Sequence, residues 1–336
     1  MTGRAEIGLG LQSDKRGEDY AGLAALAEEC GFDVLSVFGD LLFQPPIYPL
    51  LEMARATSRV RLGAACWNPY TMHPYEIAGQ VAALQQASCG RAYLGLAKGT
   101  WLDLIGISQD RPLSHLREAV QVIGALLRGD GEGIQGSVFR LAPGARLRYR
   151  LPSTLPPLLV GTWGAATAAL AGELADELKV GGTANPAMIG VMRQRLAPGL
   201  AAARRDADAV GVVVGAVTVV DDDGAAARAR ARTEVAMYLA VTGPLDPTVQ
   251  LPPDLLAGVS RHVAVGEPQR AGRLIPDDVL DLFAFAGTPG DVAAQAQRLI
   301  DAGASRVEFG TPHGLTDRSG VELLGRMVLP KLDRHG

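Results

Sequence analysis

Short apolar runs alternate with helical segments along most of this chain, and this alternation limits the folds that are open to it. Helical periodicity follows nearly every run, as in residues 20–30, which Gly31 ends, and in residues 73–88, which Pro74 opens. Eight strand–helix repeats favour a closed parallel (β/α)8 barrel, a TIM barrel, over an open doubly wound sheet. The predicted strands are residues 7–11, 34–38, 60–66, 91–97, 158–161, 177–180, 211–220 and 306–309.

Two stretches depart from this rhythm. Residues 138–150 (VFRLAPGARLRYR) alternate around a Pro-Gly pair, which predicts a small hairpin after the fourth helix. Residues 224–281 hold an Ala/Arg-rich helix, a Pro-rich loop and a further helix, which is too much chain for one barrel connection. We expect an insertion there, before the eighth strand of a single domain that spans residues 1–336. Two roles are open for it, a lid over the barrel mouth and a dimerisation arm.

The composition indicates a globular protein that acts on a small molecule. The net charge of -4 over 336 residues, without a Lys/Arg-rich cluster, excludes a strongly basic surface for nucleic acid. No apolar run is long enough to span a bilayer, and the first twenty residues lack the apolar core of a signal peptide. Cys30, Cys66 and Cys89 have no CxxC spacing, so we expect reduced thiols, no metal site and a cytoplasmic location.

Polar and glycine residues gather directly after the predicted strands. The stretch from Gly63 to Ile107 is the clearest case, because two buried strands there run straight into polar, Gly-rich and aromatic loops. In a parallel barrel the C-terminal strand ends share one face, and their loops build the active site. The candidate residues at these ends are Asp40, Lys98, Gly99, Thr100, Asp103, Gly161, Thr162, Trp163, Gly164, Gly181, Gly182, Glu308 and His313.

Motifs along nearly the whole chain resemble the luciferase-like barrel family. They are NPYTMHP after the third strand, GRAYLGLAKGTWLDLIGI around the fourth, AGELADELKVGGTANP, and the C-terminal DDVLDLFAFAGTPGDV, AGASRVEFGTPHGL and LLGRMVLPKL. The similarity is closest to the coenzyme F420-dependent branch, which is typified by methylenetetrahydromethanopterin reductase. The resemblance implies a (β/α)8 barrel with an insertion before the last strand, a homodimer, and a bound deazaflavin, coenzyme F420.

The resemblance also implies where the flat deazaflavin ring lies. Members of the family back the ring with a bulge at the end of strand three, which contains a non-prolyl cis peptide. Alignment places that bond at Ala65–Cys66, with Asn68 just beyond it. Asp40 matches the family's acidic residue near the ring, although an Asp at such a position is also a common helix N-cap.

Three departures from the family pattern limit what can be transferred. Many relatives carry a His after the acidic residue, where this chain has Leu41, Leu42 and Phe43. Carboxylates assigned in the methanopterin reductase and in the family's glucose-6-phosphate dehydrogenase are replaced by Gly10 and Thr100. The specific reactions of those two enzymes therefore do not carry over to this chain.

The remaining candidates divide between the cofactor tail and the reacting end. Residues 161–164 (GTWG) open a helix whose amides suit the cofactor phosphate, with Gly181 and Gly182 on the neighbouring strand. Lys98 either pairs with the phosphate or acidic tail or is a solvated loop lysine. Glu308, on an otherwise apolar strand, suits a cationic or amine substrate.

The last group concerns proton delivery and the pocket wall. His313 is a candidate proton donor with a pKa close to neutrality, or else a surface histidine in a Gly-Pro loop. Trp67 and Trp101 are expected as exposed aromatic walls of the substrate pocket, beside Leu41 and Phe43.

These observations predict an oxidoreductase that delivers hydride from reduced F420 to an activated C=C or C=N bond of a small molecule, in specialised metabolism. Because the relatives' acids are missing, the substrate is expected to be activated already, as a conjugated enone or an iminium is. The proton would come from His313, Thr100 or water. Two alternatives stay open, namely an FMN-dependent monooxygenase of the same superfamily and a member that binds the cofactor without turning it over.

Overall fold

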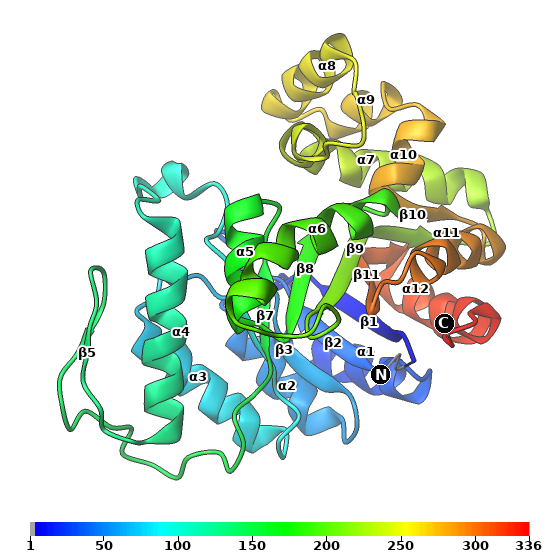
Figure 1. The fold of residues 1–336 in the computed structure, drawn as a ribbon. Coiled ribbons are helices and arrows are strands. Elements are labelled where there is room, and N and C mark those ends of the chain that lie inside the picture. The colour runs from blue at the N-terminus through cyan, green and yellow to red at the C-terminus, as the bar shows by residue number, and fades with distance from the viewer. Residues whose placement is uncertain (1–3, 336) are drawn as a thin grey trace.

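A computed structural model describes residues 4–335 and has the predicted barrel architecture (Figure 1), while residues 1–3 and 336 of the expected domain lie outside it. Eight parallel strands follow one another in the order β3-β2-β1-β11-β9-β8-β7-β4. Two isolated bridges, Leu62–Ala92 and Trp67–Leu96, join β3 to β4 and close the ring. The strands are β1 (Glu6–Leu11), β2 (Val34–Val37), β3 (Arg61–Ala64), β4 (Leu94–Leu96), β7 (Leu158–Gly161), β8 (Glu177–Gly181), β9 (Gly211–Val220) and β11 (Arg306–Gly314).

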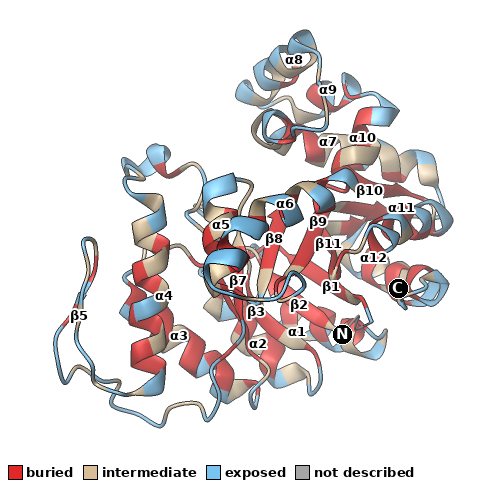
Figure 2. Cartoon of the chain, viewed as in Figure 1, coloured by how far each residue is buried: buried red, intermediate tan, exposed pale blue. Residues whose placement is uncertain are grey.

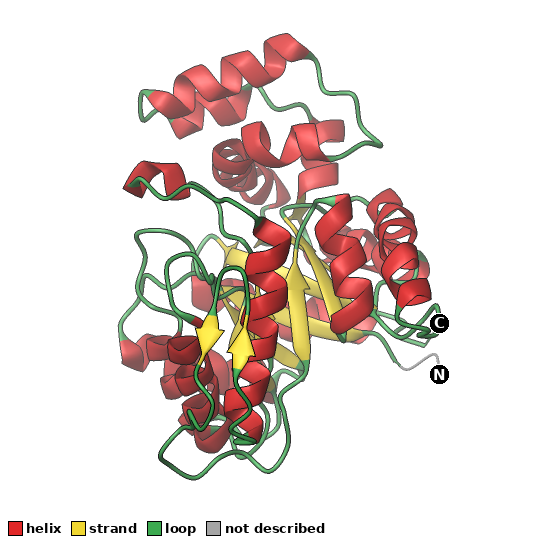
Figure 3. Cartoon of the chain, turned by 60° about the vertical axis from the view of Figure 1, so that its left-hand side comes forward, coloured by secondary structure: helices red, strands yellow, loops and turns green. Residues whose placement is uncertain are grey.

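Helices surround the yellow strands of the barrel (Figure 3). Their ends follow local sequence signals, such as the capping box of Thr288 and Asp291 at the start of α11 and the left-handed Gly129 after α4. The covering helices are α1 (Gly17–Glu29), α2 (Ile47–Ala56), α3 (Pro74–Ala87), α4 (Pro112–Arg128), α5 (Ala165–Leu174), α6 (Ala187–Ala202), α11 (Pro289–Asp301) and α12 (Asp317–Leu323). A π-turn (Leu324–Val328) and a 3₁₀ turn (Leu329–Lys331) continue α12, so the closing helix ends irregularly.

The main core lies between the barrel and its helices, where the strands in Figure 2 are almost uniformly buried. Side chains alternate along each strand, so Ile7 and Leu9 of β1 face the helices and are fully buried. Gly8 and Gly10, between them, face the barrel interior. A Cβ on Gly8 would lie 3.2 Å from Cγ of Glu308, and one on Gly10 would lie 2.5 Å from the Phe38 ring. Glycine on β1 therefore leaves room for large side chains inside the barrel.

The insertion precedes the eighth barrel strand, as predicted, and rises above the C-terminal strand ends (Figure 1). It comprises α7 (Gly224–Thr242), a 3₁₀ turn (Gly243–Leu245), α8 (Pro253–Ala264), α9 (Pro268–Arg273) and α10 (Asp277–Phe283), which share a small core of their own. A strand that sequence reasoning missed, β10 (Ala284–Gly287), then pairs with the upper half of β9. The AFAG segment is too short to show a strand period.

The predicted hairpin exists, but its bounds were wrong. Its strands are β5 (Ile134–Gln135) and β6 (Arg140–Leu141), and the Pro143–Gly144 pair lies beyond them. The Glu118 carboxylate on α4 fixes the turn instead, because it accepts hydrogen bonds from the amides of Ser137, Val138 and Phe139 at 2.8–2.9 Å. A remote side chain thus replaces the local turn signal.

Candidate active site at the barrel mouth

Asp40 lies just past β2, at the C-terminal mouth of the barrel, and is mostly buried. The Gln12 side chain, just past β1, donates a hydrogen bond of 3.0 Å from Nε2 to Oδ2 of Asp40. Burial raises the pKa of this carboxyl above its ordinary value, while Gln12 and the Lys179 charge oppose that rise. The alternative interpretation as a helix N-cap is wrong, because α2 begins at Ile47 with Pro46 as its N-cap.

The bulge after β3 contains a cis peptide at Ala65–Cys66, as the family resemblance implied. Glycines from both sides accommodate it. A Cβ on Gly39 would collide with the carbonyl oxygen of Cys66, and one on Gly161 would lie 2.9 Å from Sγ of Cys66. Burial raises the pKa of the Cys66 thiol to about 12, so this sulfur stays protonated and is no nucleophile at neutral pH.

An ion pair lies inside the barrel below this mouth. The Lys179 ammonium on β8 donates to Oε1 of Glu308 on β11, and the two side chains are 7% and 1% exposed. Oε2 of Glu308 accepts a hydrogen bond of 2.6 Å from Ser36, whose hydroxyl in turn accepts one of 2.7 Å from Tyr93. Glu308 therefore already has a buried cationic partner, and its predicted role in binding a cationic substrate is wrong. Sequence reasoning missed Lys179, although a lysine inside an apolar strand was the available signal.

The cofactor-tail candidates gather at the ends of β7 and β8. The Trp163 indole donates to the Gly181 carbonyl at 2.9 Å, and Thr162 Oγ1 accepts from the Gly164 amide at 2.9 Å. Gly164 is the N-cap of α5 and is exposed, so the first-turn amides of that helix open toward solvent. Gly182 has φ +78, a conformation that glycine adopts without strain. The arrangement suits an anion at a helix N-terminus.

The loops after β3 and β4 pack on one another. Gly99 has φ +80, and a Cβ there would collide with the Asn68 amide, whose Oδ1 accepts from the Tyr70 amide at 2.8 Å. Lys98 and Thr100 on either side of Gly99 are exposed. The structure therefore brings Asn68 and Gly99 together and leaves the two flanking side chains free in solvent.

The two tryptophans have different surroundings. Trp101 is half-buried, and its ring centre lies 6.2 Å from that of Tyr238 on α7, so the insertion contributes an aromatic residue that sequence reasoning missed. Trp67 is 2% exposed and donates from Nε1 to Gln80 of α3 at 3.0 Å. The prediction of an exposed pocket wall is wrong for Trp67, because the β-bridge to Leu96 turns its ring into the core.

The β2 loop presents its apolar side chains as expected, with Leu41 half-buried and Phe43 47% exposed. His313 differs from both interpretations, because it is fully buried, and its Nε2 bonds to the Gly10 carbonyl at 2.9 Å. Burial lowers the pKa of His313 to about 4. It is therefore neither a surface histidine nor a donor that is protonated at neutral pH.

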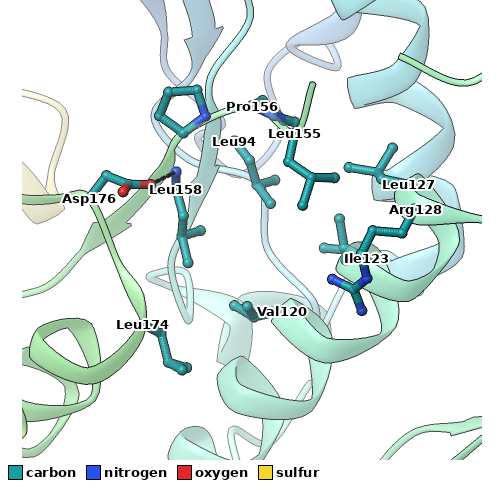
Figure 4. A pocket seen from close by; sticks show the side chains of 12 residues that line it. Leu94, Val120, Ile123, Leu127, Arg128, Leu155, Pro156, Leu158, Leu174 and Asp176 are labelled. Atoms are coloured by element: carbon teal, nitrogen blue, oxygen red, sulfur yellow. Dashed lines mark hydrogen bonds between the residues drawn. The ribbon is translucent and has the colours of Figure 1, made fainter. Parts of the chain in front are cut away.

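A separate groove of about 500 Å³ lies at the opposite end of the barrel (Figure 4). Leu94 and Leu158, the first residues of β4 and β7, line it together with Leu127 and Arg128 at the end of α4. Its apolar walls are far from Asp40, which follows the C-terminal end of its strand. Within residues 4–335, no group of three or more His, Cys, Asp or Glu side chains is placed to hold a metal ion.

The sequence model of the luciferase-like monooxygenase family matches residues 3–306. The chain belongs to this luciferase-like family. The 5,10-methylenetetrahydromethanopterin reductase of Archaeoglobus fulgidus is 30% identical over 338 residues, which cover 97% of this chain and 99% of the relative. The F420-dependent glucose-6-phosphate dehydrogenase of Nocardia farcinica is 25% identical, with 98% of both chains covered.

A solved structure has the same fold as this chain. The coenzyme F420-dependent tetrahydromethanopterin reductase of Methanopyrus kandleri superimposes with a TM-score of 0.87 at 23% identity, over 98% of this chain and all of the other. This likeness supports the barrel architecture along the whole chain. Among residues 4–335, no helix is long and apolar enough to cross a membrane.

Proposed function

We propose that this luciferase-like protein is a coenzyme F420-dependent reductase that transfers hydride to an activated C=C or C=N bond of a small molecule. The observation that carries the proposal is the end-to-end relation to an F420-dependent dehydrogenase and to a methanopterin reductase. The missing carboxylates at Gly10 and Thr100 argue against the particular substrates of those two relatives.

The residues at the mouth suit a flat ring with polar edges. Gly161 and Gly181 carry no side chains toward the opening, and a Cβ on Gly181 would meet nothing nearer than Lys179 Cε at 3.8 Å. The buried Oε1 of Gln12 has no hydrogen-bond partner among the described residues, so it is available to accept an N–H from a bound group. When bound, the reduced deazaflavin would supply the hydride, and the protein would orient it.

Asp40 is the best candidate for the donor of the proton that must follow the hydride when a C=C bond is reduced, whereas an iminium accepts the hydride without a proton. Burial favours its neutral form, and a neutral carboxyl can give a proton to the atom next to the reduced carbon. Trp101 and Tyr238 would cover the opening and keep water out, with the insertion acting as a lid. The Cys66 bulge would fix which ring face meets the substrate.

Anaerobic assays with reduced F420 test the proposal directly. The loss of reduced F420 is followed by its absorbance, with conjugated enones and iminium compounds offered as acceptors. NADPH and reduced FMN with oxygen are the parallel donors. Turnover with reduced F420 alone supports a reductase, whereas oxygen-dependent turnover with FMN supports the monooxygenase and turnover with NADPH alone ends the proposal. Tight F420 binding without turnover of any acceptor favours the non-catalytic alternative.

We further infer a cytoplasmic homodimer that serves specialised metabolism. The family resemblance supports dimerisation, and the three free cysteines suit a reducing compartment. Light scattering of the purified protein tests the dimer, since a mass of 35.1 kDa would indicate a monomer instead.

A further inference from the structure

A stack of aromatic rings connects the hairpin to the loop after β3. Tyr70 lies in that loop, and its ring is stacked on the ring of His115, near the start of α4, with centres 3.9 Å apart and planes 17° apart. Phe139, in the hairpin turn, meets the His115 ring edge-on at 5.4 Å. No step of the proposed reaction uses these three side chains.

The hairpin fixes one end of this stack. Phe139 is 8% exposed, and its amide donates to Oε2 of Glu118 on α4 at 2.8 Å. Nδ1 of His115 is buried and has no hydrogen-bond partner within residues 4–335. His115 therefore contributes the contacts of a flat ring rather than a hydrogen bond from this nitrogen.

The other end of the stack is bonded to both loops of the candidate ring site. The Tyr70 amide donates to Oδ1 of Asn68 at 2.8 Å, and the Tyr70 hydroxyl donates to the Asp110 carbonyl at 2.7 Å. The Asn68 amide group lies directly against Gly99, where an added Cβ would collide with it. Gln109 donates to the Gly99 carbonyl at 3.0 Å. The position of Tyr70 thus fixes how the loops after β3 and β4 meet.

We propose that Tyr70 and His115 are positioning residues, which hold Asn68 and Gly99 in the geometry that binds the deazaflavin. The inference rests on the proposed function, because it takes Asn68 and Gly99 as cofactor-binding residues. Loss of the stack would let the two loops separate. The barrel strands beneath them would stay in register, because their backbones pair with neighbouring strands.

His115 and His73 provide a matched pair of variants. Both rings meet Phe139 edge-on, at 5.4 Å and 5.3 Å, but within residues 4–335 His73 makes no ring contact with Tyr70. H115N removes the stack. H73N removes only ring contacts outside the stack, and asparagine still serves as the N-cap of α3, the position that His73 occupies. H115F keeps a flat ring on Tyr70.

Hydrogen–deuterium exchange of the unliganded full-length protein is the first measurement, followed by mass spectrometry of peptides that cover residues 68–72 and 97–111. In H115N both segments should exchange several times faster than in the wild type, because the Tyr70 amide and the β4 loop are no longer held. In H73N and H115F the rates should stay near those of the wild type.

Titration with reduced F420 is the second measurement. Its dissociation constant should rise by about 2- to 10-fold in H115N, the worth of one aromatic pair, and should return to the wild-type value in H115F. At saturating cofactor kcat should change little, because the stack touches none of the reacting groups. If H115N does not fold, Y70L takes its place, and Y70F is then the variant that keeps the ring.

Equal effects of H115N and H73N would show that the two histidines only stabilise the hairpin, and would overturn the inference. Unchanged exchange in H115N, or weak binding that H115F does not restore, would overturn it as well. No binding of reduced F420 by the wild type would end the proposed function and, with it, the inference. Binding by the wild type that is equally tight in H115N would end the inference alone.

Discussion

At the scale of single residues, the environment of Asp40 matters more than its identity. A carboxyl in water is ionised at neutral pH, but burial at the barrel mouth favours the protonated form. This burial is what makes Asp40 a candidate acid.

Asp40→Asn should lower kcat/KM by about 100-fold, the usual worth of a positioned general acid, while reduced F420 still binds. In the wild type the rate should fall as pH rises through the raised pKa of Asp40, because the proton is then lost. The variant should lose this limb of the pH profile. Stopped-flow rates over a pH series measure both effects, with Asp206→Asn, at an exposed position in the loop before β9, as the control. An unchanged limb in Asp40→Asn would assign the proton to another group.

Sequence reasoning reached some of these residues and missed others for physical reasons. The cis bond at Ala65–Cys66 could be predicted because the order of the family motifs implied its position, and the same motif order drew attention to Asp40. The burial of His313 could not be predicted, because a Gly-Pro segment usually forms an exposed loop. Here β11 continues through the segment and buries the imidazole. Lys179 was visible as a charge inside an apolar strand, but its pairing was not, because its partner Glu308 lies 129 positions away.

At the scale of elements, long-range side-chain contacts fix the segments that interrupt the barrel. Glu118 on α4 holds the β5–β6 turn, and Asn185 after β8 holds the insertion. Asn185 Nδ2 donates to Asp246 at 2.9 Å and to Thr248 at 2.8 Å. Because both side chains are distant in sequence from the segments that they hold, periodicity alone could predict neither the bounds of the hairpin nor how the insertion is attached to the barrel.

Glu118→Gln should lower the free energy of unfolding by about 1–3 kcal/mol at pH 7, because the hairpin amides, of which that of Phe139 is buried, lose a charged acceptor. Hydrogen bonds from the hairpin amides lower the pKa of Glu118 from 4.5 to about 2, against the opposing effect of burial. This stabilisation is present above pH 4.5 and is lost as pH falls toward 2. Denaturant unfolding at several pH values should show that the difference in the free energy of unfolding between the variant and the wild type shrinks as pH falls. The exposed Glu132→Gln in the same connection is the control, and a pH-independent gap would contradict the account.

Asn185→Ala should loosen the insertion while the barrel stays folded. Its amide is buried and donates twice, so its loss removes the donor to Oδ2 of Asp246, a residue that is 3% exposed, while Thr248 still donates to Oδ1. Limited proteolysis should then cut residues 243–252 at least several times faster, with little change in the far-UV spectrum. Gln194→Ala on the exposed face of α6 is the matched control. Equal cleavage rates in the two variants would show that the insertion is held elsewhere.

At the scale of the whole molecule, the barrel has two different cores. Apolar side chains fill the layer beneath the helices, as the strand periodicity predicts. The interior instead combines a few apolar residues, such as Val34 and Leu159, with charges from several strands. The eight-strand ring could be predicted from the sequence because each strand is locally regular. The charged interior was not, because its partners meet only after the ring has closed.

Substitution of Arg306 tests how far the stability of the closed barrel depends on these buried charges. It is fully buried, with Nη1 lying 3.3 Å from Oε2 of Glu177 and Nε 4.0 Å from Oε2 of Glu308. Arg306→Met leaves these carboxylates with one cation fewer, and should lower the free energy of unfolding by about 3–5 kcal/mol. Arg306→Met with Glu177→Gln removes one charge of each sign, so it should regain part of that loss. The exposed pair of Arg326 and Glu322 is the control, where Arg326→Met should change the same quantity by less than about 1 kcal/mol. Chemical denaturation followed by circular dichroism measures all three variants, and a double variant less stable than Arg306→Met would show that Glu177 stabilises the barrel through contacts other than this charge.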